Sequence, residues 1–180
     1  MDIAVLVIDG QHIALLIQNN DGEWAYYSIN GDNVQFSGEH TGGRPFDDLG
    51  DRSFDSPDAF LQSDYNRDLG KMGKSNKDVA NYKYISAYII QTDDDHQQDS
   101  IIVDEFKRIS QEETYRLSPA NHCGTAVQRS LLKGGIETRR KYAIGSSSGA
   151  LYYGMRFTYF PSITYKQIKE NNNGREVFRK

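Results

Sequence analysis

The chain has 180 residues, a length that suits one domain with a full-sized hydrophobic core, and its formal net charge is −4. The acidic balance argues against a protein that follows the phosphate backbone of a nucleic acid, since such proteins carry a basic face. A single cysteine excludes an internal disulfide and any zinc site built from several cysteines, and no apolar run reaches the length of a membrane-spanning helix. We expect one domain over residues 1–180, with a polar, frayed tail from about residue 169.

The first third of the chain is dominated by strand and turn signals. Residues 1–9, MDIAVLVID, are apolar, few and end in an acid, which predicts a strand and not a signal peptide. Residues 11–18 and 24–30 flank the turn-forming sequence NNDGE at 19–23, so a β-hairpin is predicted. Residues 37–56 are poor in aliphatic side chains and rich in Gly, Asp and Ser, and we expect a loop there.

The middle of the chain contains signals for one short helix and one strand. Ser56 followed by Pro57 is typical of a helix start, which predicts a helix over 56–65. The polar residues 66–78 indicate a loop. Residues 82–92 are β-branched and aromatic, so they predict a strand inside the sheet.

Two amphipathic helices are predicted in the second half. One covers 99–113, where apolar residues recur on one helical face. The other covers 123–133, with Lys133 in its last turn and glycine after it as a stop signal. The apolar faces are Ile102, Val103, Phe106 and Ile109 in the first helix, and Ala126, Val127, Leu131 and Ser130 in the second. Residues 150–160 fit a strand or a helix equally well.

The only cysteine, Cys123, opens the second of these helices within SPANHCGTAVQRSLLKGGI, residues 118–136. A free cysteine is ordinarily a buried apolar side chain. At a helix N-terminus, however, the unpaired N–H groups and the helix dipole lower the pKa of a thiol and stabilise an oxyanion. Two interpretations therefore stand for Cys123, a packing residue and a nucleophile.

A thiol nucleophile needs a base, usually a histidine, and the chain has four. His122 is next to Cys123, and neighbours at a helix start generally point apart. His40 and His96 lie in polar segments, where a solvated histidine is the ordinary outcome. His12 opens an apolar strand, although spacing alone explains it equally well as a strand-end histidine.

The predicted hairpin indicates which side chains lie near His12. If the turn is centred in NNDGE, His12 lies opposite the end of the second strand. Ser28 and Asn30 share one face there, because strand side chains alternate. Either can accept a hydrogen bond from the imidazole, and an ordinary strand serine is the alternative for Ser28.

Three stretches carry a resemblance. DGQHIALLIQNNDGEWAYYSINGDN (9–33) places a histidine after a glycine at a strand start, then a turn and an aromatic strand that ends in serine. YIIQTDDDHQQDSIIVDEF (88–106) gives a strand, an Asp-containing break and a helix, and TYRLSPANHCGTAVQRSLLKGGI (114–136) gives a tyrosine, a short loop, the cysteine helix and a terminal GI. This pattern resembles the permuted papain-like (NlpC-type) cysteine hydrolase superfamily, mainly its Rhs-type and related polymorphic toxin modules.

The resemblance implies an α+β, papain-like fold in which an antiparallel sheet packs against the helix that bears the nucleophile. The histidine strand precedes the cysteine helix in the permuted members, as His12 precedes Cys123 here. The implied roles are Cys123 as nucleophile and His12 as general base and then acid. Ser28 is our choice for the third position, where better-known relatives have His, Asn or an acid.

Three further residues are candidates for the oxyanion or substrate site. The family typically has Asn directly before the cysteine, and His122 stands there in this chain, either shaping the oxyanion hole or facing solvent. Tyr115 stands where the family has a tyrosine and would line the substrate groove or fill the core. Asn30 is the other neighbour expected near His12.

The function implied is that of an antibacterial effector that hydrolyses an amide of the peptidoglycan peptide through a thioester intermediate. We expect action in the target-cell periplasm, with the cytoplasm as alternative, delivery without a Sec signal, and a cognate immunity protein as partner. We expect no metal, no cofactor, no nucleic acid and no membrane insertion, and DDDH at 93–96 is expected to be a solvated turn. The alternatives are a lipid acyltransferase or thioesterase, a protein-directed protease or deamidase, and a binding module without activity.

Overall fold

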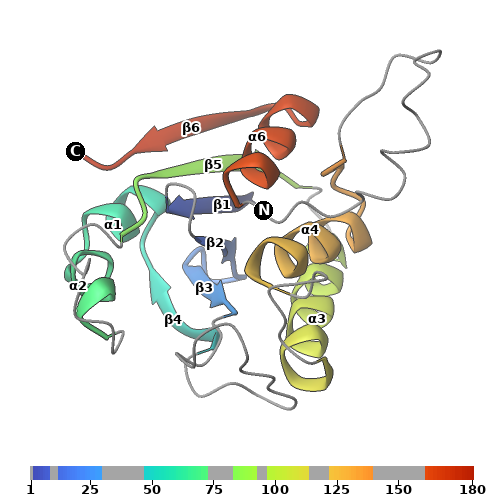
Figure 1. Cartoon of the computed structure of the whole chain (residues 1–180), viewed down its shortest axis with the longest axis horizontal. Coiled ribbons are helices and arrows are strands. Elements are labelled where there is room, and N and C mark those ends of the chain that lie inside the picture. Colours follow the sequence, from blue (N-terminus) through green and yellow to red (C-terminus); the bar gives the residue numbers. More distant parts are fainter. Residues whose placement is uncertain are drawn as a thin grey trace.

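A computed structural model describes residues 2–8, 12–29, 47–72, 83–92, 97–113, 122–139 and 161–180. One six-stranded antiparallel sheet forms its centre, with the strand order β4-β3-β2-β1-β5-β6 (Figure 1). The strands are β1 (Asp2–Ile8), β2 (His12–Gln18), β3 (Trp24–Ser28), β4 (Asp48–Phe54), β5 (Ser86–Gln91) and β6 (Gly174–Phe178). The helices are α1 (Pro57–Gln62), α2 (Asp64–Met72), α3 (Gln97–Glu112), α4 (Cys123–Lys133) and α6 (Pro161–Asn171). The α+β class and the antiparallel sheet agree with the sequence.

The hairpin of β2 and β3 forms as predicted. The Asn19 side chain closes its turn, because Oδ1 accepts hydrogen bonds from the N–H groups of Asp21 (3.0 Å) and Glu23 (2.9 Å). Gly22 has a φ of 85°, a conformation that residues with a Cβ rarely adopt. The register pairs Leu15 with Tyr27, which fixes what lies opposite the start of β2.

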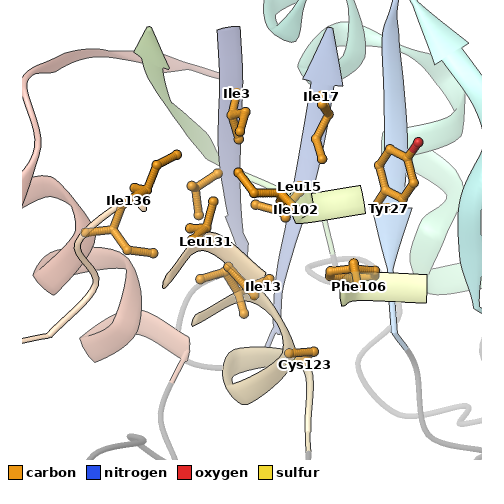
Figure 2. Packing of buried hydrophobic residues seen from close by; sticks show 14 of the residues in the cluster. Ile3, Ile13, Leu15, Ile17, Tyr27, Ile102, Phe106, Cys123, Leu131 and Ile136 are labelled. Carbon is orange, nitrogen blue, oxygen red and sulfur yellow. The ribbon is translucent and has the colours of Figure 1, made fainter. Parts of the chain in front are cut away.

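The two faces of the sheet pack against different helices. Alternate residues of β2, Ile13, Leu15 and Ile17, join the core cluster formed with α3, α4 and α6 (Figure 2). Ala14 and Leu16 point the other way, into a second cluster that contains residues of α1. The sheet is therefore covered on both faces, and neighbouring residues of β2 belong to different layers.

The two amphipathic helices form where the sequence predicts them, and polar contacts join α3 to α4. Arg129 of α4 pairs with Glu113, which also pairs with Arg108 of α3. Just past the C-terminal end of α4, Gln98 Nε2 donates to the carbonyl of Gly134, 2.6 Å away. These contacts fix the axis of α4 and so the position of its first residue.

Two predictions of loops were wrong. Residues 64–72, predicted to be largely loop, form α2, since Tyr65 and Leu69, one helical turn apart, pack on the second cluster. Residues 48–54, inside the predicted loop 37–56, form β4. This polar strand is held by pairing with β3, and pairing of this kind overrides weak strand propensity.

The predicted polar tail is also ordered. Helix α6 runs to Asn171, and β6 then pairs with β5 at the edge of the sheet. The exposed side chains of an edge strand resemble a frayed terminus in sequence, which explains the error. Residues 37–46, 73–78, 93–96 and 150–160, for which we made predictions, lie outside the described residues. In the described part of the chain, no helix is long and apolar enough to cross a bilayer.

Candidate active site

Cys123 is the first residue of α4, as the sequence predicts, and His122 is the N-cap. The backbone at His122 is extended, and its side-chain Nδ1 accepts a hydrogen bond from the Gly124 N–H at 3.1 Å. Figure 2 shows Cys123 at the start of α4, at the margin of the cluster that holds Ile13 and Phe106. The thiol is 4 % exposed.

Burial dominates the electrostatics of the thiol. The N–H groups of Ile13, Gly124 and Cys123 itself interact with the sulfur and lower its pKa. Loss of solvent is the larger effect and raises the pKa of Cys123 to about 11. The lowered pKa expected for a thiol at a helix start is therefore wrong for this structure, because that expectation did not include burial.

His12 and Ser28 are joined as the hairpin register predicts. His12 Nε2 and Ser28 Oγ lie 2.9 Å apart, and both residues are buried. His12 shares its face of β2 with Ala14, so the pair lies on the face opposite to Ile13. The bond fixes the ring of His12 through one of its two nitrogens.

The thiol contacts β2 at a backbone N–H group. The Ile13 N–H interacts with the sulfur, and Ile13 directly follows His12 in the chain. Cys123 and His12 thus both lie where β2 begins, with the sulfur on the Ile13 face of the sheet and the imidazole on the opposite face. Burial, together with the nearby His122, lowers the pKa of His12 to about 4. Both the thiol and the imidazole are consequently neutral at pH 7.

His122 is buried, which excludes one of the two alternatives left open by the sequence, that it faces solvent. Its loss of solvent lowers its pKa, and the neutral ring carries its proton on Nε2 because Nδ1 accepts from Gly124. Sequence reasoning did not identify His122 as the N-cap, because the residues preferred at that position are Ser, Thr, Asp and Asn. Tyr115, Asn30, His40 and His96 lie outside the described residues.

Sequence reasoning missed Tyr84, whose ring centroid lies 6.0 Å from that of His12. Tyr84 is fully buried just before β5. Nothing local marks it, because strand segments commonly carry tyrosine and its contact with His12 depends on how β1 brings β5 to β2.

A cavity of about 420 Å³ lies at the far end of β2, between the hairpin turn and α3. Its lining includes Ile17, Tyr27 and Asp99. Ile17 is five residues from His12, roughly 17 Å along a strand, so the cavity is separate from the Cys123 site. Among the described residues, no group of His, Cys, Asp and Glu side chains is arranged to hold a metal ion.

The Ser28 contact predicts a measurable effect on stability. In Ser28→Ala, the buried hydrogen bond between Nε2 of His12 and Oγ of Ser28 is lost, and we expect a loss of about 1–2 kcal/mol of unfolding free energy. Urea denaturation at neutral pH measures it. Ser53→Ala, which removes an exposed bond to Glu23, is the control and should change stability by less than about 0.5 kcal/mol. Equal effects of both substitutions would show that the His12 bond adds nothing.

Comparison of the chain with protein families, with curated proteins and with solved structures found no match, so the family resemblance drawn from the sequence stays an expectation.

Proposed function

We propose that this chain is a cysteine hydrolase in which Cys123 is the nucleophile and His12 is the general base and then the general acid. The observation that carries the proposal is the junction of α4 with β2. There the buried thiol meets the Ile13 N–H, beside a histidine whose Nε2 is bonded to Ser28. A nucleophile, a base and a group that orients the base are the three parts that acyl transfer to sulfur requires.

The neutral thiol and imidazole define the first step. As the sulfur attacks the amide carbonyl carbon, the thiol proton passes to His12 around the start of β2, because the sulfur and the imidazole lie on opposite faces of the sheet. Nδ1 receives the proton when Nε2–H donates to Ser28. The tetrahedral oxyanion that forms is stabilised by N–H groups at the start of α4. Breaking of the C–N bond, with proton transfer from His12 to the amine, leaves a thioester on Cys123. His12 then takes a proton from water, which attacks the thioester and releases the acid and the thiol.

The substrate class is proposed from the sequence resemblance. We propose the peptide of peptidoglycan, cleaved in the target-cell periplasm by an effector delivered without a Sec signal. The support is the order of histidine strand, break and cysteine helix, over the stretches 9–33, 88–106 and 114–136. An immunity protein that blocks Cys123 is the partner expected for such an effector.

Digestion of purified peptidoglycan by the wild-type chain tests this function. Mass spectrometry is expected to find peptides split with the gain of one water, giving one new amine and one new carboxylate. The rate should be constant from neutral pH downward and fall only near pH 4, because His12 is a competent base only while neutral and burial lowers its pKa to about 4.

The matched variant is His12→Gln, which keeps a polar side chain but cannot exchange the proton. We expect its rate to fall by about 10²–10⁴. Intact peptidoglycan after prolonged digestion would overturn the substrate assignment. An unchanged rate in His12→Gln would overturn the assignment of the base.

A further inference from the structure

Two neighbours restrain the ring of His12, Ser28 and Tyr84, and each of them is connected to β3. Ser28 of β3 bonds Nε2 of His12 at 2.9 Å. Two residues earlier on the same face, Tyr26 shares a 2.8 Å hydroxyl–hydroxyl hydrogen bond with Tyr84. The Tyr84 ring in turn packs on His12, with centroids 6.0 Å apart and planes inclined by 50°. These three contacts link four side chains, and the β3 backbone between Tyr26 and Ser28 closes the circuit.

Tyr84 is itself fixed more firmly than a packed ring needs. The Asn66 side chain of α2 accepts from the Tyr84 N–H at 2.8 Å and donates to the Tyr84 carbonyl at 3.0 Å. Both residues are fully buried. Phe60 of α1 packs on the Tyr84 ring as well, at 5.5 Å between centroids. The tyrosine therefore has its backbone, its hydroxyl and its ring all restrained.

We propose that Tyr84 is a positioning residue for His12: its restrained ring sets the plane of the imidazole and keeps water from that side of it. The proposal rests on the proposed function, since a positioned imidazole matters only if His12 exchanges a proton. The Ser28 bond holds the ring at Nε2. The Tyr84 ring, packed beside the imidazole, limits its rotation as well, and general-base catalysis depends on such alignment.

The neighbours of His12 make its titration a readout of this contact. The His12 ring packs against Tyr84, just before β5, and is bonded to Ser28 of β3. The charge of His122, the N-cap of α4, acts on it electrostatically. Cys123 lies beyond the Ile13 backbone. Of these, His122 is the group whose charge lowers the pKa of His12, after burial itself. Opening the Tyr84 side to water reduces the burial and so raises the pKa of His12.

The test is an NMR titration of the histidine ring protons in the full chain, with His12 assigned from His12→Gln. In the wild type His12 should be mostly neutral at about pH 5. In Tyr84→Leu the midpoint should rise from about 4 toward the ordinary 6.5. Tyr84→Phe keeps the ring and should titrate near the wild type. If Tyr84→Leu does not fold, Tyr84→Met, whose unbranched side chain adapts better to the space left by the ring, replaces it.

Phe60→Leu is the matched control, since Phe60 lies in the same aromatic cluster and touches Tyr84 but makes no ring contact with His12 among the described pairs. Its His12 midpoint should not move. An equal shift in Phe60→Leu, or no shift in Tyr84→Leu, would overturn the proposal. Hydrolysis by Tyr84→Leu should show a lower kcat at unchanged KM. A wild-type chain that hydrolyses nothing yet shows the Tyr84-dependent shift would overturn the proposed function and leave the restraint of His12 standing.

Discussion

Replacing Cys123 by alanine should abolish hydrolysis and leave the fold intact. The alanine cannot form the thioester, and removal of a covalent nucleophile typically lowers turnover by ~10³ or more. The structural effect is small, because one sulfur atom is removed from the margin of the core and Ala suits the start of α4. The readouts are peptide release from purified peptidoglycan and the survival of cells that express the chain in the periplasm.

Ser130→Ala is the control for this prediction. Ser130 is a fully buried small residue of the same helix, two turns along from Cys123. It should show a comparable change in unfolding free energy with full hydrolysis and full toxicity. A Cys123→Ala protein that retains about a tenth of the wild-type rate would eliminate the thioester mechanism. Cys123 would then be the buried packing residue that the sequence also allows.

Reactivity of the resting thiol does not distinguish these two interpretations. A cysteine that is 4 % exposed and has a pKa of about 11 reacts slowly with iodoacetamide at neutral pH, in an enzyme and in a binding module alike. The imidazole does not offset this, because burial keeps His12 neutral as well. Under the proposed mechanism, the thiolate forms only as the proton moves to His12 with a substrate bound. Only an assay with substrate therefore decides between the two.

Short-range patterns predicted the parts of the site that depend on neighbours in the chain. NNDGE sets the turn, the turn sets the register, and the register brings Ser28 to His12. The start of α4 at Cys123 follows from the amphipathic stripe and the glycine stop. Each of these inferences spans one hairpin or one helix, a range over which periodicity carries the information.

Long-range packing determines what the sequence could not predict. The pKa of Cys123 depends on how deeply α4 settles against β2, and these elements lie far apart in the chain. Strand β6 forms because it pairs with β5 at the edge of the sheet. Helix α2 forms because Tyr65 and Leu69 pack on the second cluster. The role of Asn66 was invisible for the same reason, since its partner Tyr84 belongs to another element.

Asn66→Ala should be among the most damaging single substitutions for stability, at about 3 kcal/mol or more. The side chain is fully buried and makes three hydrogen bonds to backbone groups, namely the Tyr84 N–H (2.8 Å), the Tyr84 carbonyl (3.0 Å) and the Leu61 carbonyl (2.9 Å). Alanine leaves all three groups buried without this partner, and each such loss costs about 1–3 kcal/mol. Urea denaturation gives the change in unfolding free energy.

Asn19→Ala is the control for Asn66→Ala. It shows whether the loss of unfolding free energy follows the burial of the hydrogen bonds or merely their number. The Asn19 side chain also holds two backbone N–H groups, those of Asp21 and Glu23, but it does so at an exposed turn where water replaces it. Its loss should therefore be about 1 kcal/mol or less. A loss for Asn66→Ala within that range would contradict the prediction. It would mean that the segment around α2 rearranges so that the backbone groups of Leu61 and Tyr84 find other hydrogen-bond partners. Because Asn66 holds the backbone of Tyr84, a large loss should come with a raised pKa of His12 in the folded variant, joining the stability of α2 to the chemistry at β2.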